Sequence, residues 1–252
     1  MTTTPDLTGE VALVTGASSG LGEQFALTLA AHGAAVAVAA RRTDRLTALA
    51  SRIADAGGTV LPVELDVTDA DAITRAVDAV AADLGTPTIL VNNAGVPDAA
   101  RAHRMSLELV DRVLDTNLRG PWLLATEVAR RLLEEKRHGR IVNISSMSAY
   151  HYAGEGAALY SVTKAGIARM TEVLAVEWAA RHINVNAIAP GAFSSEMLDG
   201  MVERIGDISD QYPRRRVGRR DQLDSTLLYL VSPASDAVTG TVLKVDDGQF
   251  HR

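Results

Sequence analysis

The stretch Val11-Ala-Leu-Val-Thr-Gly16-Ala-Ser-Ser-Gly20-Leu-Gly22 decides the fold. It begins as a short apolar run, passes through a glycine-rich turn and leads into a helical pattern. Small residues at such a turn let backbone N–H groups approach a pyrophosphate at a helix N-terminus, where the helix dipole favours negative charge. Glycines alone could equally mark a tight turn, but a strand before them and a helix after them favour dinucleotide binding. The candidate phosphate-binding residues are Gly16, Ser18, Ser19, Gly20, Leu21 and Gly22.

Outward from this turn, short apolar and β-branched runs alternate with helix-length segments. We expect strands at 11–14, 35–39, 60–63, 89–91, 141–144, 183–188 and 242–245, and helices at segments such as 23–32, 45–56 and 70–84. Asp44 and Thr68 are plausible N-caps for two of these helices. The alternation predicts an α/β fold with one doubly wound (Rossmann) domain over 1–252, a parallel seven-stranded sheet and helices on both faces. Residues from about 190 to 217 form the main irregular stretch and are predicted to be a substrate-binding loop or lid.

The composition limits the classes of function. A net charge of -6 gives no general affinity for nucleic acid or anionic membranes. The chain has no cysteine, and its 6 histidines are scattered without ligand-like spacing, so we expect no disulfide, thiolate site or metal. The first residues do not resemble a signal peptide, and no apolar run is long enough to span a bilayer. We therefore expect a cytoplasmic protein that acts on small molecules.

Two arginines indicate which dinucleotide is bound. A carboxylate about 20 residues after the glycine turn would bind the ribose 2′-hydroxyl and select NAD. No acidic residue occurs between Gln24 and Thr43, and the second expected strand ends at Arg41 and Arg42. Guanidinium groups bind phosphate bidentately, so the arrangement favours NADP(H) over NAD(H). The alternative is that these arginines only form a solvated end of the strand.

Tyr160 and Lys164 are the candidate catalytic pair, because residues four apart share one face of a helix. The expected helix runs to about residue 180. A free tyrosine has a pKa near 10 and is a poor base at neutral pH. An ammonium about 4 Å away, at an effective dielectric near 20, would favour the phenolate by up to ~4 kcal/mol. A lone Tyr-x-x-x-Lys is common by chance and then marks only an amphipathic surface.

Polar and glycine-rich features follow other expected strands. They are Ser145 and Ser146, the run 92–95 (Asn-Asn-Ala-Gly), Pro190 with Gly191, and Asn117, which lies in a helical pattern between two strands. In a doubly wound sheet, ligands bind beyond the carboxyl ends of the strands. These features and the Tyr160 helix are therefore expected to form one site.

The combination resembles the short-chain dehydrogenase/reductase (SDR) family, including members of the 3-oxoacyl-reductase, carbonyl-reductase and alcohol-dehydrogenase types. The resemblance covers essentially the whole chain. The matching motifs are Thr15-Gly-Ala-Ser-Ser-Gly-Leu-Gly22, Asp66-Val67, Asn92-Asn-Ala-Gly95, Asn117-Leu, Ser145-Ser146, Tyr160-Ser-Val-Thr-Lys164, Asn184-Val-Asn-Ala-Ile-Ala-Pro-Gly191 and Val245-Asp-Asp-Gly248.

The resemblance implies roles for these residues. Tyr160 would protonate the carbonyl oxygen in reduction or take the alcohol proton in oxidation, and Lys164 would lower its pKa and hold the nicotinamide ribose. Ser146 would donate to the substrate oxygen, and Asn117 would hold a water in a proton path to Lys164. The other cofactor contacts implied are Asp66 and Val67 beside the adenine, Asn93, Ala94 and Gly95 beside the adenosine ribose, and Pro190, Gly191, Phe193 and Ser195 near the nicotinamide. The resemblance also implies a homotetramer, with a dimer as the alternative.

Two departures from the family pattern stand out. Ser146 lies one residue farther from Tyr160 than the family serine does, and the family spacing would reach Met147, which has no hydroxyl. We retain Ser146, with Ser145 and Ser148 as lesser candidates, and place the extra residue in the loop 148–158. Position 19 is a serine where NADP-selective relatives often have a basic residue.

The substrate does not follow from the sequence. The loop 148–158, the segment 98–105 and the segment 190–217 are expected to build its pocket, with Tyr152 and Met197 as contacts. The alternative for Tyr152 is an exposed turn. The predicted function is an NADP(H)-dependent oxidoreductase acting on a ketone or secondary alcohol. The alternatives are an NAD-preferring dehydrogenase of the same family and a non-catalytic NADP(H)-sensing protein.

Overall fold

A seven-stranded, fully parallel sheet forms the centre of the protein, in the order β3-β2-β1-β4-β5-β6-β7. The computed structural model describes residues 5–152, 154 and 156–250. The strands are β1 Val11–Thr15, β2 Ala35–Ala40, β3 Val60–Glu64, β4 Ile89–Asn92, β5 Gly139–Ile144, β6 Ile183–Pro190 and β7 Val242–Val245. All seven strands fall where the sequence predicted them, which confirms the predicted fold class.

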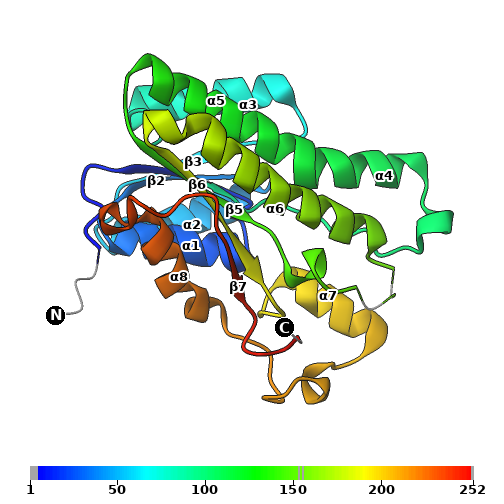
Figure 1. Ribbon diagram of the computed structural model, residues 1–252. Helices are drawn as coiled ribbons and strands as arrows, with labels where there is room; N and C mark the ends of the chain where they lie inside the picture. Colours follow the sequence, from blue (N-terminus) through cyan, green and yellow to red (C-terminus); the bar gives the residue numbers. More distant parts are fainter. Residues whose placement is uncertain (1–4, 153, 155, 251–252) are drawn as a thin grey trace.

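Helices cover both faces of the sheet (Figure 1). The helices are α1 Gly20–Ala31, α2 Thr43–Asp55, α3 Ala70–Asp83, α4 Leu107–Leu114, α5 Gly120–Glu134, α6 Ala158–Trp178, α7 Glu196–Ile205 and α8 Asp224–Val231. Apolar residues of α3, α5 and α6 form one core against the sheet, and those of α1, α2 and α8 form the other. The central strands are buried on both faces, which explains why their sequences lack polar alternation.

Some local predictions were wrong. Asp69, not Thr68, caps α3, because its Oδ1 accepts from the N–H groups of Asp71 (2.9 Å) and Ala72 (3.0 Å). The N-cap position of α2 is Arg42, and Asp44 lies inside the first turn of that helix. Thr68 instead binds the Asp66 carboxylate through its own N–H and hydroxyl.

The segment 190–217 is less irregular than predicted. It contains α7, whose N-cap Ser195 accepts a hydrogen bond from the Leu198 N–H at 3.2 Å. Gly200 within α7 obscured the helical pattern in the sequence. α7 lies beyond the carboxyl ends of the strands, next to the end of β6 (Figure 1).

Candidate active site

The glycine-rich turn is built so that its backbone lies open to a ligand. Gly16 and Gly20 have φ values of +65° and +61°, which side chains rarely tolerate. A Cβ at Gly16 would lie 2.9 Å from Ala94 Cα, so the turn packs against the end of β4. Ser19 is the N-cap residue of α1, but its side chain accepts no hydrogen bond from the first N–H groups of the helix. This cradle fits a pyrophosphate.

Hydrogen bonds hold the end of β4 against that turn. Thr15 Oγ1 accepts from the N–H groups of Asn93 (3.1 Å) and Ala94 (3.2 Å), and Asn93 Nδ2 donates to the Thr15 carbonyl at 3.0 Å. The strand order reverses between β1 and β4, which is where doubly wound folds bind ligands.

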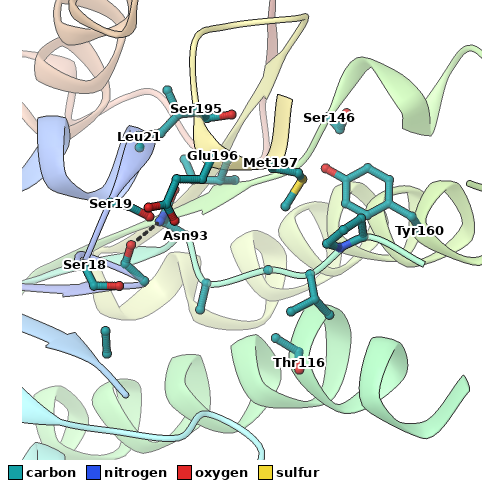
Figure 2. A pocket seen from close by; sticks show the side chains of 18 of the residues that line it. Ser18, Ser19, Leu21, Asn93, Thr116, Ser146, Tyr160, Ser195, Glu196 and Met197 are labelled. Atoms are coloured by element: carbon teal, nitrogen blue, oxygen red, sulfur yellow. Dashed lines mark hydrogen bonds between the residues drawn. The ribbon is translucent and has the colours of Figure 1, made fainter. Parts of the chain in front are cut away.

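Tyr160, Lys164 and Ser146 meet at the other end of the same cleft. Figure 2 shows Tyr160 and Ser146 close together, away from Ser18, Ser19 and Glu196. Lys164 is buried, with 4% of its surface exposed, and its Nζ donates to the Ile144 carbonyl at 2.8 Å. The same nitrogen lies 5.5 Å from the centre of the Tyr160 ring.

Ser146 is the serine that faces Tyr160. A hydrogen bond from Ser146 acts on the phenol and lowers its pKa, whereas Ser145 donates its hydroxyl to the Lys164 carbonyl at 2.8 Å. Met147 is buried in the protein, and Ser148 does not line the cleft. The loop 148–158, where we expect the extra residue, leads into α6 at Ala158, and residues 153 and 155 lie outside the described part of the chain.

The pKa shifts at this end have one main cause, which is loss of hydration. Burial raises the pKa of Tyr160, the Ser146 hydrogen bond opposes this change, and the charge of Asp98 adds to it. Burial lowers the pKa of Lys164 to about 8. The direction at Tyr160 is opposite to the one expected from the sequence, because burial of the phenol is the largest cause of the shift and raises the pKa.

A single cleft of about 580 Å³ joins the two ends, a size typical of ligand sites. Most of the predicted site residues line it: Gly16, Ser18, Ser19, Gly20, Leu21, Arg41, Arg42, Asp66, Val67, Asn93, Ala94, Gly95, Ser146, Tyr160, Lys164, Pro190, Gly191, Phe193, Ser195 and Met197. Gly22, Asn117 and Tyr152 do not line it. Gly22 is buried where α1 packs on Asn93, and Tyr152 is 52% exposed, in agreement with the alternative of an exposed turn.

Comparison with known proteins agrees with this geometry. The family model described as enoyl-(acyl carrier protein) reductase matches residues 16–249. The chain belongs to the short-chain dehydrogenase/reductase family. A 3-oxoacyl-[acyl-carrier-protein] reductase from Thermotoga maritima is 35% identical over 96% of this chain and 98% of its own. A crystal structure of a short-chain dehydrogenase/reductase from Mycobacterium marinum has a TM-score of 0.94 at 36% identity, covering 98% of both chains. A structure of actinorhodin polyketide ketoreductase with NADPH has a TM-score of 0.90 at 33% identity, covering 95% of this chain and 97% of that one.

As a member of the SDR family, the protein is an oxidoreductase that acts on CH–OH or carbonyl groups with a nicotinamide cofactor. Among the described residues, no group of histidines and carboxylates is arranged to hold a metal ion. None of the helices in the described part of the chain is both long and apolar enough to cross a membrane.

Arg42 brings a positive charge to the glycine-rich turn. Its Nη2 donates to the hydroxyl oxygens of Ser18 (3.0 Å) and Ser19 (2.8 Å), so the guanidinium lies on the glycine-rich turn. Arg41 lies beside Asp66, where its Nη1 is 3.8 Å from Asp66 Oδ2. Both arginines line the cleft.

Asn117 supports the cleft from behind. It lies in a π-helical turn, Asp115–Arg119, an element often found at functional sites. Its Oδ1 accepts from the Val96 N–H at 2.8 Å, and its Nδ2 donates to the Val96 carbonyl at 2.9 Å. Both ends of the Asn117 side-chain amide are therefore used to fix the loop after β4. A water in the proton path implied by the family resemblance would have to bind other polar groups of this π-helical turn.

Three residues with clear roles in the cleft or its walls were missed in the sequence. Glu196 pairs with Arg42 (3.0 Å) and with Arg45. The hydrogen bond with Arg45 is the largest cause that lowers the pKa of Glu196, which falls to about 2, and the bond with Arg42 acts in the same direction. Gln249 binds both the N–H (2.6 Å) and the carbonyl (3.0 Å) of Ala192, which anchors the start of the 190–217 segment. Asp98 hydrogen-bonds the start of α6.

Proposed function

We propose that the protein is an NADP(H)-dependent oxidoreductase that transfers a hydride between the nicotinamide and a ketone or secondary alcohol, with Tyr160 as general acid/base. The observation that carries the proposal is the single cleft lined by the glycine-rich turn and Arg42 at one end and by Tyr160, Lys164 and Ser146 at the other. A site that places a phosphate cradle and a proton donor in one cavity suits reduction of a bound carbonyl compound.

The side chains divide the work as follows. When bound, the nicotinamide supplies or accepts the hydride. In reduction, the Tyr160 hydroxyl gives its proton to the carbonyl oxygen, and in oxidation the phenolate takes the alcohol proton. Ser146 donates a hydrogen bond to the same oxygen and stabilises its developing negative charge. Lys164 uses one of its three donors on Ile144, so two are left for the ribose hydroxyls.

The preference for NADP(H) rests on Arg41 and Arg42. Both lie at the end of β2 and line the cleft, which suits a 2′-phosphate. A neighbour with NADPH bound, the actinorhodin polyketide ketoreductase, is consistent with this choice. The second candidate is an NAD-preferring dehydrogenase, and Glu196 favours it, because its carboxylate already pairs with Arg42 and Arg45.

The substrate is proposed to be a small carbonyl compound or alcohol that contacts Ser146, Tyr160 and Met197. Met197 is 37% exposed and lies on α7, from which it faces the cleft. The relative from Thermotoga maritima is a 3-oxoacyl-[acyl-carrier-protein] reductase, which makes 3-oxo thioesters sensible members of a test panel. We also propose a homotetramer, because α5 and α6 expose Trp122 (44%), Val162 (63%) and Val176 (80%).

A substrate panel assayed with both cofactors tests the proposal. Ketones and 3-oxo thioesters should consume NADPH faster than NADH at equal concentrations. Tight NADPH binding without turnover on any of these substrates would contradict the proposed substrate class. A consistent preference for NADH would favour the second candidate.

A further inference from the structure

Asp98 is a buried carboxylate that the proposed chemistry does not use. It lies in the irregular segment after β4, and only 2% of its surface is exposed. Its Oδ1 accepts from the Ala99 N–H at 2.9 Å. Its Oδ2 accepts from the N–H groups of Leu159 (2.9 Å) and Tyr160 (3.1 Å). Two of its three hydrogen bonds therefore go to the first turn of the helix that carries the proton donor.

The helix needs this partner, because its own N-cap cannot serve. The N-cap residue of α6 is Ala157, which has no side-chain acceptor, and the helix is 21 residues long. The first N–H groups of a helix lack partners within the helix, and a negative charge beside them is favoured by the dipole. Asp98 supplies this cap from a segment about sixty residues earlier in the chain. Its buried charge is in turn compensated by three N–H donors.

The surrounding backbone keeps the two segments together. Ala99 has a φ of +49°, in the left-handed region that a residue with a Cβ adopts at some cost. Gly156, just before α6, has a φ of +81°, and a Cβ there would lie 3.2 Å from the Ala100 carbonyl carbon. Asn117 fixes Val96, two residues before Asp98. The cofactor-facing end of β4 is thus joined to Tyr160 by a short series of defined contacts.

We propose that Asp98 is the positioning residue of Tyr160: its carboxylate fixes the start of α6 against the loop after β4 and so sets where the Tyr160 phenol lies. This inference rests on the proposed role of Tyr160. Among the described residues, Asp98 is the charged group that shifts the pKa of Tyr160, Lys164 on the same helix lies 5.5 Å from the ring centre, and Ser146 faces the phenol as a neutral hydroxyl. After burial, the negative charge of Asp98 is a further cause of the raised pKa of Tyr160.

The test uses two substitutions at Asp98 and a matched control. Asp98→Asn keeps an acceptor oxygen and removes the charge, whereas Asp98→Ala removes both. Asp69→Ala is the control, because Asp69 also caps a helix through two N–H groups but is the N-cap of α3, outside the cleft. Both alanine variants should lose stability, with Tm lower by about 1–8 °C.

The pKa of Tyr160 is read from its phenolate absorbance, as the difference between each protein and its Tyr160→Phe counterpart. This measurement needs no cofactor. Asp98→Asn and Asp98→Ala should both lower that pKa, and Asp69→Ala should leave it unchanged. Hydrogen exchange at the amides of Leu159 and Tyr160 should accelerate in Asp98→Ala and less in Asp98→Asn.

Kinetics complete the test. Asp98→Ala should lower the kcat of reduction by about 10- to 100-fold, the scale expected for a misplaced catalytic group, at unchanged NADPH affinity. Asp98→Asn should recover part of kcat and shift the alkaline fall in reduction to lower pH. An unchanged phenol pKa and kcat in both variants, or a kcat loss equal to that of Asp69→Ala, overturns the proposal. If Asp98→Ala does not fold, the phenol pKa and the kcat of Asp98→Asn alone test the proposal. Activity that survives Tyr160→Phe would instead contradict the proposed function, while phenol titration and exchange would still test Asp98.

Discussion

The two ends of the cleft hold their charges in opposite ways. At the end formed by the glycine-rich turn, the side chains of Arg41 and Arg42 are 68% and 43% exposed and pair with Asp66 and Glu196, which are also partly exposed. At the other end, Lys164 is buried and donates to a backbone carbonyl. Exposed ion pairs contribute about 0–1 kcal/mol, whereas moving a pKa by one corresponds to about 1.4 kcal/mol. Substitutions should therefore have large effects at the buried end and small, salt-dependent effects at the exposed end.

The largest effect is expected for Tyr160→Phe. The change removes the proton donor but keeps the ring beside Lys164, so kcat should fall by about 10²–10⁴-fold, the range of general acid catalysis. The dissociation constant of NADPH should remain the same in a binding titration. Tyr152→Phe is the control, since Tyr152 lies outside the cleft, and should retain wild-type kcat. A Tyr160→Phe enzyme within tenfold of wild type would mean that another group delivers the proton.

Burial of Lys164 should also appear in the pH dependence of stability. Burial lowers the pKa of this lysine from its ordinary value of 10.5 to about 8, so between these values the unfolded chain holds more protons than the folded protein. The free energy of unfolding should therefore rise as the pH increases above 8, by as much as about 1.4 kcal/mol per pH unit. Above pH 10 the raised pKa of Tyr160 lowers the free energy of unfolding as the pH increases, because the tyrosine then loses its proton more readily in the unfolded chain. The measurement should therefore stay below pH 10.

Urea unfolding of wild type and Lys164→Met across this range isolates the contribution. The methionine side chain is of similar length and does not titrate, so its curve should lack the rise. Parallel curves for the two proteins would show that Lys164 keeps its charge at no cost in the folded state.

The contrast between the two ends also explains what the sequence could predict. The strands, the glycine turn and the Tyr160–Lys164 spacing are local patterns, so they could be predicted from the sequence. Arg41 and Arg42 directly follow β2 in the sequence, and both line the cleft as predicted. The direction of the Tyr160 pKa shift was wrong, because it depends on how deeply the tyrosine and lysine are buried. Burial is a property of the whole fold.

The missed contacts join distant parts of the chain. Asp98 meets α6 across 61 positions, Gln249 meets Ala192 across 57, and Glu196 meets Arg42 across 154. Nothing in the local pattern around an isolated aspartate or glutamate indicates such a partner. The fold has to be known before these side chains acquire a role.

At the exposed end, Arg42→Ala is expected to have an intermediate effect. Arg42 places its guanidinium on Ser18 and Ser19, so its loss should weaken NADPH binding about tenfold, or about 1.4 kcal/mol, and NADH binding hardly at all. Arg41→Ala should act in the same direction. Arg75→Ala, on α3 and outside the cleft, is the control for loss of a surface arginine. Equal losses for both cofactors would show that the arginines do not recognise the 2′-phosphate.

Glu196→Gln should have the smallest effect and the opposite sign. Because its pKa is lowered to about 2, Glu196 is ionised throughout any practical assay range and places a negative charge beside Arg42 and Arg45. A 2′-phosphate on Arg42 would be repelled by that carboxylate, so removing the charge should tighten NADPH binding about two- to fivefold and leave NADH unchanged. The gain should shrink as salt screens the interaction. Glu203→Gln, on the same helix but outside the cleft, should change neither affinity. Weaker NADPH binding in Glu196→Gln would give Glu196 the reverse role: it would then hold Arg42 in position for the phosphate, and the exposed end would be preorganised like the buried one.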